Sequence, residues 1–371
     1  MAPPPCQQPV LMDELIEQFL LRLPPAEPTN LVCAALVCKR WCRLVSDHGF
    51  RRRFREFHRT PPMLGFLCNL IDCSSGFIAR FVPTSSSCTP HTDHRGWRAR
   101  DSRHGRVLLH TYPTGHVYAS FRLVVWDPTT GEWLELPKPP RDPCSWTAAV
   151  LCAAVGACDH LNCHRGPFVV VLVGTDDKEM FACVYSSESG AWSEPTSAKH
   201  PGDRVSWARS ALVGNALYFV FEMNDRILEY DLGTREMPVM QLPAAITSLV
   251  STPYGPIELM AMEDGRLGFA RVQESRLCIW SKDVEDAGWT LSKDIELEKL
   301  LPLNNGSPTA AHDLVGFADG IGLVFVKVED GIFTVDLKSG RTRKVCEGSY
   351  ITSVVPYVNF CTPGTSLSQT S

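Results

Sequence analysis

The sequence predicts a small all-α module followed by an all-β domain. Apolar residues recur at helical spacing near the N-terminus, between Leu15 and Leu23. After about residue 60, short β-branched and aromatic runs separated by Gly, Asp and Asn replace that spacing. An aromatic motif also returns about every 50 residues. We therefore expect a flexible tail, a helical module, a β domain and a second tail, at residues 1–9, 10–58, 60–360 and 361–371.

The helical module is predicted from two apolar segments and the break between them. Apolar residues 15, 16, 19, 20 and 23 line one face of a helix that opens at Leu11. The proline-rich residues 23–28 end this helix, because proline in a helix interior removes a hydrogen bond and clashes with the preceding turn. A second apolar run at residues 31–38 leads into Lys39-Arg40-Trp41, and an arginine-bearing amphipathic helix is expected around residues 50–57.

This order and spacing resemble the F-box, a helical module that docks a Skp-family adaptor into a cullin-based ubiquitin ligase. The resemblance covers about residues 10–55 and departs from the family at Met12, where proline is usual. It implies docking by apolar anchors in a groove. The adaptor-facing positions that it implies are Leu11, Leu15, Ile16, Leu20, Pro24, Val37, Cys38, Lys39 and Trp41. Phe19, Leu23, Leu31 and Leu36 are just as well explained as the module's own core, and the sequence does not separate the two sets.

A repeated motif organises the β domain. Its copies, of which Trp126-Asp127-Pro128-Thr129-Thr130-Gly131 is the fullest, begin at positions 126, 185, 230, 280 and 335, so they are 59, 45, 50 and 55 residues apart. A turn followed by a strand precedes most copies, at Gly105, Gly214, Gly265 and Gly320. Because Asp at such a turn caps its own backbone, we interpret the motif as architecture and not as a ligand-binding box.

All-strand units with a period near 50 residues are typical of propeller blades of kelch-like repeat length. A ring of blades also hides the strand edges that an open sheet exposes. Five copies are visible and residues 64–82 are expected to form a degenerate sixth, so we predict a β-propeller of about six blades. A β-sandwich or two packed sheets is the alternative. Residues 84–95 are expected to form a polar loop.

We expect the chain to act inside the cell, in the cytoplasm or the nucleus. Its 15 cysteines are scattered and odd in number, which is typical of buried thiols in a reducing compartment. The N-terminus has no signal-peptide pattern, and the longest apolar run, residues 148–158, is too short to cross a bilayer. A basic cluster at Arg51-Arg52-Arg53 has no counterpart elsewhere, so we expect neither a nucleic-acid nor a membrane partner.

One cluster of soft ligands invites a metal. The weak zinc candidates in the segment 158–164 are Cys158, His160, Cys163 and His164. The chain has no Cys-x-x-Cys hairpin, so we interpret this segment as a polar loop and expect no metal or cofactor. The segment resembles one in grass F-box proteins with an associated β domain, as do residues 61–66 and 126–128. This resemblance implies a plant protein of the F-box plus propeller type.

Catalytic motifs for phosphate loops, dinucleotide binding, zinc proteases and serine hydrolases are missing from the sequence. Together with this absence, the resemblance implies a non-catalytic substrate receptor. It would bind a Skp-family adaptor, and through the adaptor a cullin, while its β domain would bind an unknown target protein. One alternative is a propeller enzyme or ligand-binding protein with a helical cap, which requires titratable residues that converge at the central channel. Another is an F-box scaffold that acts outside ubiquitination.

Overall fold

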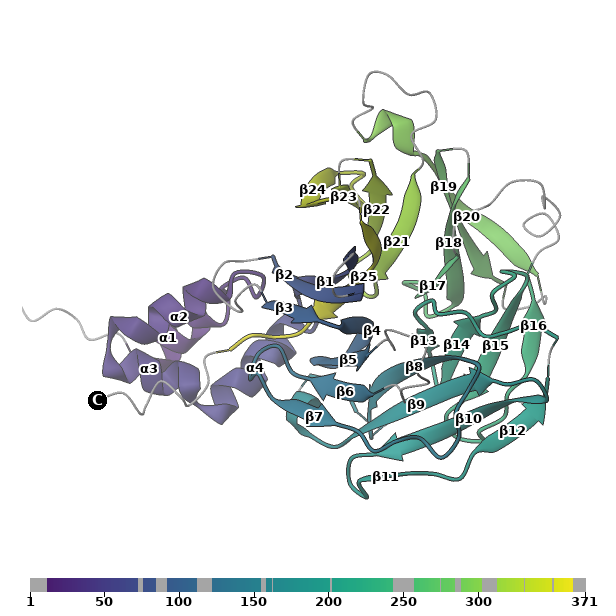
Figure 1. The fold of residues 1–371 in the computed structure, drawn as a ribbon. Coiled ribbons are helices and arrows are strands. Elements are labelled where there is room, and N and C mark those ends of the chain that lie inside the picture. Colours follow the sequence, from purple (N-terminus) through teal and green to yellow (C-terminus); the bar gives the residue numbers. More distant parts are fainter. Residues whose placement is uncertain are drawn as a thin grey trace, which may run out of the picture.

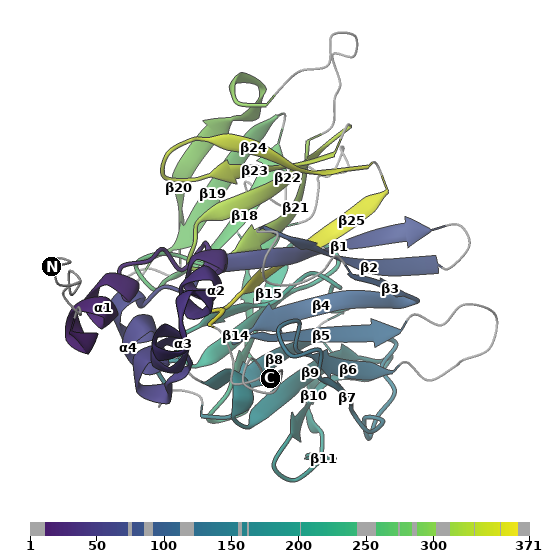
Figure 2. The ribbon, with the colours of Figure 1, turned by 90° about the vertical axis from the view of Figure 1, so that its left-hand side faces the viewer.

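In the part of the chain that the structure describes, four α-helices stand beside a ring of six β-sheets (Figure 1). The structure is a computed structural model, and it describes residues 12–72, 76–84, 92–111, 122–154, 158–161, 163–200, 202–242, 257–273, 275–283, 288–301, 312–329, 331–348 and 350–362. The helices pack near the edge of the ring that holds the first and last strands (Figure 2).

The helical module consists of α1 (Asp13–Leu20), α2 (Pro28–Val37), α3 (Lys39–Ser46) and α4 (His48–His58). Pro28 is the first residue of α2, where its missing N–H costs no helical hydrogen bond. The carboxylate of Asp47 caps α4 by accepting from the Phe50 amide at 2.9 Å. The buried core of the module comprises Ile16, Leu20, Leu21, Leu31, Ala34, Ala35, Val45, Phe50, Phe54 and, from the C-terminal segment, Phe360.

Each sheet is an antiparallel blade whose strands follow one another from the centre of the ring outward. Blade one is β25 (Ile351–Val358), β1 (Met63–Asp72), β2 (Gly76–Pro83) and β3 (Thr92–Arg95), and blade two is β4 (Trp97–Arg103), β5 (Arg106–Thr111), β6 (Leu123–Trp126) and β7 (Trp133–Glu135). Blade three is β8 (Ser145–Cys152), β9 (Phe168–Thr175) and β10 (Glu179–Ser186), with β11 (Ala191–Trp192) and β12 (Thr196–Lys199) both paired to β10.

The second half of the ring repeats the four-stranded pattern. Blade four is β13 (Ala211–Val213), β14 (Ala216–Val220), β15 (Arg226–Asp231) and β16 (Val239–Gln241). Blade five is β17 (Glu258–Ala261), β18 (Leu267–Gln273), β19 (Arg276–Lys282) and β20 (Trp289–Glu296), and blade six is β21 (Asp313–Ala318), β22 (Leu323–Val328), β23 (Gly331–Asp336) and β24 (Thr342–Glu347). Two short 3-10 helices, Cys163–Arg165 and Leu297–Lys299, lie in connections.

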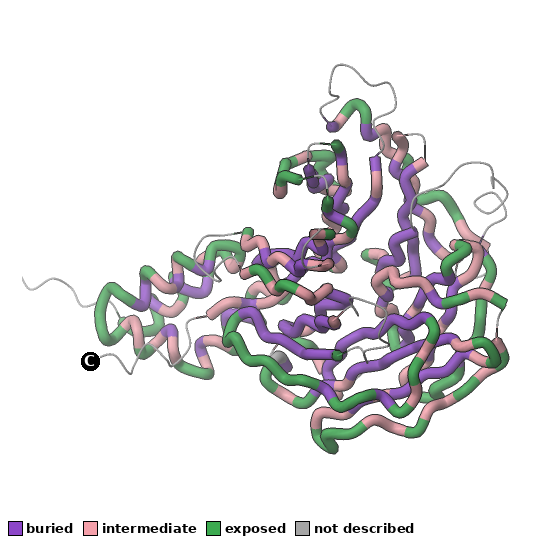
Figure 3. Tube along the Cα trace, viewed as in Figure 1, coloured by how far each residue is buried: buried purple, intermediate pink, exposed green. Residues whose placement is uncertain are grey.

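The ring closes by pairing the two ends of the β domain. β25, the last strand, pairs antiparallel with β1, the first strand, so blade one is built from both ends of the domain. A separate apolar cluster joins each pair of neighbouring blades, and the cluster between blades six and one includes Phe325 and Phe66, whose ring centroids are 5.3 Å apart. Burial accordingly follows the inner strands around the ring (Figure 3). The predicted six-bladed propeller is confirmed, and the sandwich alternative is wrong.

The repeated motif lies at the same place in five blades, where the third strand ends and the turn to the fourth begins. The Asp336 carboxylate accepts from the Lys338 and Ser339 amides at 2.8 and 2.9 Å. Asp127 and Asp231 cap their own turns in the same way. The architectural interpretation of the motif is therefore confirmed.

Blade one differs from the expectation for residues 84–95. Thr92–Arg95 form β3, the outer strand of that blade, where a polar loop was expected. Arg80 and Asp93 pair across β2 and β3 through two hydrogen bonds of 2.9 and 3.0 Å. An exposed outer strand needs no apolar run, which is why its polar sequence did not indicate a strand. The kelch-like character of the repeats stays a prediction.

Candidate partner-docking surfaces

An apolar stripe on α1 faces solvent. Met12, Leu15 and Phe19 follow one another at spacings of three and four residues, which places them on one side of the helix. The side chains of Leu15 and Phe19 remain 53% and 60% exposed. The neighbouring side of the helix carries Ile16 and Leu20, which are buried in the module. α1 is therefore apolar on two adjacent sides, although its own module covers only one of them.

The end of α2 continues this exposed surface. Leu36 and Val37 are 71% and 65% exposed just before the kink that separates α2 from α3. The guanidinium of Arg40, in the first turn of α3, pairs with the Asp13 carboxylate at 2.5 Å, so the start of α3 lies against the start of α1. We call the exposed set Met12, Leu15, Phe19, Leu36 and Val37 the apolar stripe. Several large apolar side chains exposed on one small module are typical of protein-binding surfaces.

The structure separates the residues that the sequence left unsorted. Of the expected adaptor-facing residues, those on the surface are Leu15, Pro24, Val37, Cys38 and Lys39. Ile16 and Leu20 are buried and are corrected to core residues, because a buried side chain presents no surface to a partner. Trp41 is half-buried against the module's core, and Leu11 lies outside the described residues.

Two residues that the sequence left as candidates for the module's core are exposed. Phe19 and Leu36 lie on the surface, whereas Leu31 is buried and Leu23 packs partly against the core. The helical spacing of Met12, Leu15 and Phe19 was the signal that could have found the stripe. It was hidden because Ile16, Leu20 and Leu23 are also at helical spacing, four and three residues apart, on the adjacent side of the helix.

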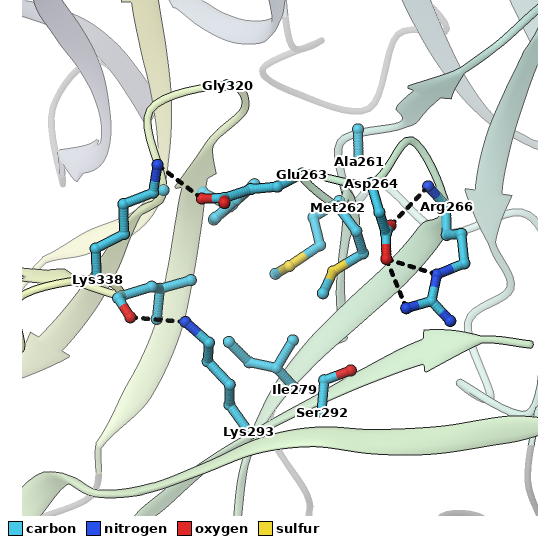
Figure 4. A pocket seen from close by; sticks show the side chains of 14 residues that line it. Ala261, Met262, Glu263, Asp264, Arg266, Ile279, Ser292, Lys293, Gly320 and Lys338 are labelled. Atoms are coloured by element: carbon cyan, nitrogen blue, oxygen red, sulfur yellow. Dashed lines mark hydrogen bonds and ion pairs between the residues drawn. The ribbon is translucent and has the colours of Figure 1, made fainter.

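A groove of about 610 Å³ lies between blades five and six (Figure 4). Its floor carries the flexible thioethers of Met260 and Met262, which adapt to irregular partner surfaces. Charged side chains surround the floor, and Glu263 and Lys338 form an ion pair of 2.9 Å across the groove. The turns β17–β18 and β21–β22 build this groove, and they join the first and second strands of their blades.

The groove opens on the side of the ring that carries the helical module. The β8–β9 connection also joins a first and a second strand, and its Leu161 packs partly against the module's core. Antiparallel blades place all such connections on one face of the ring. The groove and the module therefore share a face.

Ionic groups converge at the centre of the ring, as the enzyme alternative requires. The fully buried Asp101 carboxylate pairs with Arg103 and, at 3.2 Å, with Arg209, which also reaches Asp319 at 3.2 Å. Burial raises the pKa of nearby Glu258 to about 7, although Arg209 opposes the shift and Asp319 adds to it. The carboxylates of Asp101 and Asp319 are thus paired with arginines and join blades two and six through Arg209, an arrangement typical of a structural network.

The structure brings together part of the weak metal candidate. Cys158, His160 and Cys163 are joined by Cys152, from the end of β8, so that the four ligand atoms lie within 4.8 Å of one another. Sequence reasoning missed Cys152 because it lies six residues earlier, within a strand. The side chain of His164 lies outside the described part of the chain. Burial, together with the thiols of Cys152 and Cys158, raises the pKa of Cys163.

No helix within the described ranges is long and apolar enough to cross a membrane.

Comparison with known proteins places both parts of the chain. The F-box-like family matches residues 13–56, and the family described as "F-box protein AT5G49610-like, beta-propeller" matches residues 98–363. F-box protein At5g49610 of Arabidopsis thaliana is 25% identical over 297 residues, which cover 77% of this chain and 79% of that protein. F-box protein At1g49990 of the same plant is 25% identical over 191 residues, and the match spans 42% of this chain and only 44% of that protein.

Among solved structures, a protein from Lactobacillus plantarum is similar over 77% of this chain and 82% of its own, with 11% identity and a TM-score of 0.45. The score is too low to carry an argument about function. The propeller match alone spans well over half of the sequence, and the helical module ahead of it matches a second F-box description. The chain therefore belongs to the F-box proteins of the AT5G49610-like β-propeller family.

Proposed function

We propose that this chain is a substrate-receptor subunit of a Skp–cullin–F-box ubiquitin ligase. Its helical module would bind a Skp-family adaptor and through it a cullin, and its propeller would bind a target protein. The observation that carries the proposal is the apolar stripe, which is the exposed surface of a module that matches the F-box-like family. A free module gains nothing from exposing Leu15 and Phe19, whereas burial of such side chains in a partner's groove contributes most of the affinity in helix-in-groove complexes.

The adaptor surface that we propose is narrower than the sequence implied. It consists of the apolar stripe together with Pro24, Cys38 and Lys39, and it leaves out Ile16 and Leu20. Trp41 packs its half-buried ring against the module's core, so we assign it a role in holding the adaptor surface in shape.

The chain would contribute proximity and no chemistry of its own. A receptor that holds the target and the ligase together converts a bimolecular encounter into a tethered one, which raises the effective concentration of the target. The groove between blades five and six supports target binding on the propeller, because its methionine floor and charged rim suit an irregular protein surface. We place the chain's action in the cytoplasm or nucleus, a proposal that rests on its scattered cysteines.

Reconstitution tests the proposal. Full-length protein is mixed with a purified Skp-family adaptor and a cullin scaffold, and the mixture is separated by size-exclusion chromatography. We expect the three proteins to co-elute, and we expect Leu15→Asp with Phe19→Asp to elute apart from the adaptor and the cullin. Phe57→Asp is the matched control, since Phe57 is an exposed aromatic on α4 outside the stripe. Separate elution of the unaltered protein contradicts the proposal.

A further inference from the structure

We propose a structural Zn²⁺ site held by Cys152, Cys158, His160 and Cys163. Three thiols and one imidazole make up a Cys₃His set, one of the sets that structural zinc sites use. Soft thiolate ligands in a tetrahedral arrangement favour zinc over the hard cations, which prefer oxygen. The four residues come from two places in the chain, because Cys152 ends β8 and the other three lie in the β8–β9 connection.

The distances fit a tetrahedral ion. The Cys163 Sγ and His160 Nδ1 atoms are 3.6 Å apart. Zn–S and Zn–N bonds of about 2.3 and 2.05 Å at a tetrahedral angle place sulfur and nitrogen about 3.6 Å apart, and two sulfurs about 3.8 Å apart. All four ligand atoms already lie within 4.8 Å of one another, so only small movements of these side chains are needed for one ion to bind all four.

Contacts around the cluster hold the ligands in place. The His160 amide donates to Cys158 Sγ at 3.3 Å, and the Cys152 amide donates to His104 Nδ1 at 3.0 Å. The His104 and His160 rings stack with their centroids 4.0 Å apart, which fixes the orientation of the His160 imidazole. His160 also has a φ of 56°, a left-handed conformation that is costly for a residue other than glycine. Such strain persists where surrounding contacts demand it, commonly at functional sites.

A buried positive charge balances the site. Three thiolates, a neutral imidazole and Zn²⁺ together carry one net negative charge. The guanidinium of Arg106 donates to the Cys163 carbonyl at 3.1 Å, so its positive charge lies beside the cluster. The same guanidinium lies 5.0 Å from the centre of the Phe168 ring, at the start of β9. Buried ions need such partners, since an uncompensated charge in a protein interior is strongly unfavourable.

The location gives the site a role in the joint between the helical module and the propeller. Leu161, between two of the ligands, packs partly against the module's core. Asp159 and Leu161 also line a hollow together with Glu56 and Arg59 of the module's end. A zinc ion would therefore tie this connection to β8 and brace the module against blade three. In the proposed ligase this brace would fix how the adaptor is held relative to the target.

Metal analysis of the full-length protein tests the site. After extensive dialysis we expect about one zinc per chain by inductively coupled plasma mass spectrometry. X-ray absorption of the same sample is expected to show three sulfurs and one nitrogen around the ion. Cys158→Ser and His160→Gln are each expected to lower the retained zinc at least roughly tenfold. His160→Cys restores a four-ligand set and is expected to retain the metal.

Cys144→Ser is the matched control, because Cys144 is an exposed thiol at the other end of β8 and outside the cluster. Circular dichroism verifies that each variant is folded, and the unaltered protein needs no variant to give its answer. Protein that holds no zinc in zinc-containing buffer overturns the proposal. A disulfide between two of the three thiols, found by mass spectrometry in place of the metal, also overturns it.

The bracing role has its own readout. Removal of zinc by a chelator is expected to speed tryptic cleavage after Arg59, in the exposed linker between α4 and β1, several-fold in the unaltered protein. The same treatment should leave the cleavage rate of Cys158→Ser unchanged. If the linker of the zinc-loaded protein is cut at the same rate with and without the chelator, the metal site stands but the bracing role is refuted. This test is independent of adaptor binding.

Discussion

Removal of the Asp101 carboxylate should lower the stability of the propeller by breaking the ionic network at its centre. Asp101 is fully buried at the inner strand of blade two and pairs with Arg103 and Arg209. It also accepts from the Val150 amide of blade three at 2.9 Å. Arg209 extends the network to Asp319 and to the Phe317 carbonyl of blade six, at 3.2 and 2.9 Å. One carboxylate thus links residues from three blades.

The size of the effect follows from what Asp101→Ala leaves behind. The buried Arg103 guanidinium loses the carboxylate it pairs with, Arg209 keeps its pair with Asp319, and the Val150 amide loses its acceptor. Loss of one partner of a buried ion pair costs about 3–5 kcal/mol, because the remaining charge stays buried without compensation. We expect a loss near 4 kcal/mol, which for a domain of this size lowers the melting temperature by about 5–10 °C.

Asp93→Ala is the control for Asp101→Ala. It removes the same residue type from an arginine pair, but Arg80 and Asp93 lie on the surface, where such a pair is worth at most about 1 kcal/mol. Thermal and urea unfolding, followed by circular dichroism, measure both variants. Equal shifts for Asp101→Ala and Asp93→Ala would refute the account of a central ionic network.

Three further predictions concern pH, ring closure and the repeated turn. Burial raises the pKa of Glu258 from 4.5 to about 7 in the fold, so the native protein loses stability as pH rises across that window. Glu258→Gln removes this titration, so it should stabilise the protein by roughly 3 kcal/mol at pH 8 and have little effect below pH 4.5. Urea titrations in which the advantage of the variant does not grow with pH would contradict this. Gly316→Ala should cost about 1–3 kcal/mol, since a Cβ atom there would lie 2.5 Å from the Val354 carbonyl oxygen in blade one; unchanged thermal stability would mean that blades six and one do not meet as described. Asp127→Ala should cost about 1–2 kcal/mol by removing the acceptor for the Thr129 amide and hydroxyl, both at 2.7 Å; a melting curve identical to that of the unaltered protein would argue against the turn's structural role.

The blades could be predicted from sequence because their signals are local. The repeated Asp lies where a strand ends and the next turn needs its amides capped, so its spacing reports the blade period directly. Residues 64–82 lack this motif and were assigned to a degenerate sixth blade from another local signal, the strand-like residues around Gly76-Phe77-Ile78. Ring closure by β25 was not predictable, because the pairing of residues 284 positions apart, such as Asn69 and Ser353, leaves no local pattern.

The candidate sites show where sequence reasoning stops. α1 is apolar on two adjacent sides, and only the packing of the module decides that Leu20 is inside and Phe19 outside. The Cys/His cluster needed Cys152, which lies in a buried strand and resembles an ordinary small apolar residue there. Both sites depend on contacts between segments that are distant in sequence or on a choice between similar helix faces.

Adaptor affinity tests the central claim most directly. Isothermal titration calorimetry of full-length protein with a Skp-family adaptor compares the unaltered chain with Leu15→Asp/Phe19→Asp and with Phe57→Asp. Burial of two large apolar side chains is worth about 3–6 kcal/mol, so we predict at least a roughly hundredfold weaker Kd for the double variant and an unchanged Kd for the control. Equal affinities for all three proteins, or no binding by any of them, would contradict the account of α1 as the adaptor-binding surface.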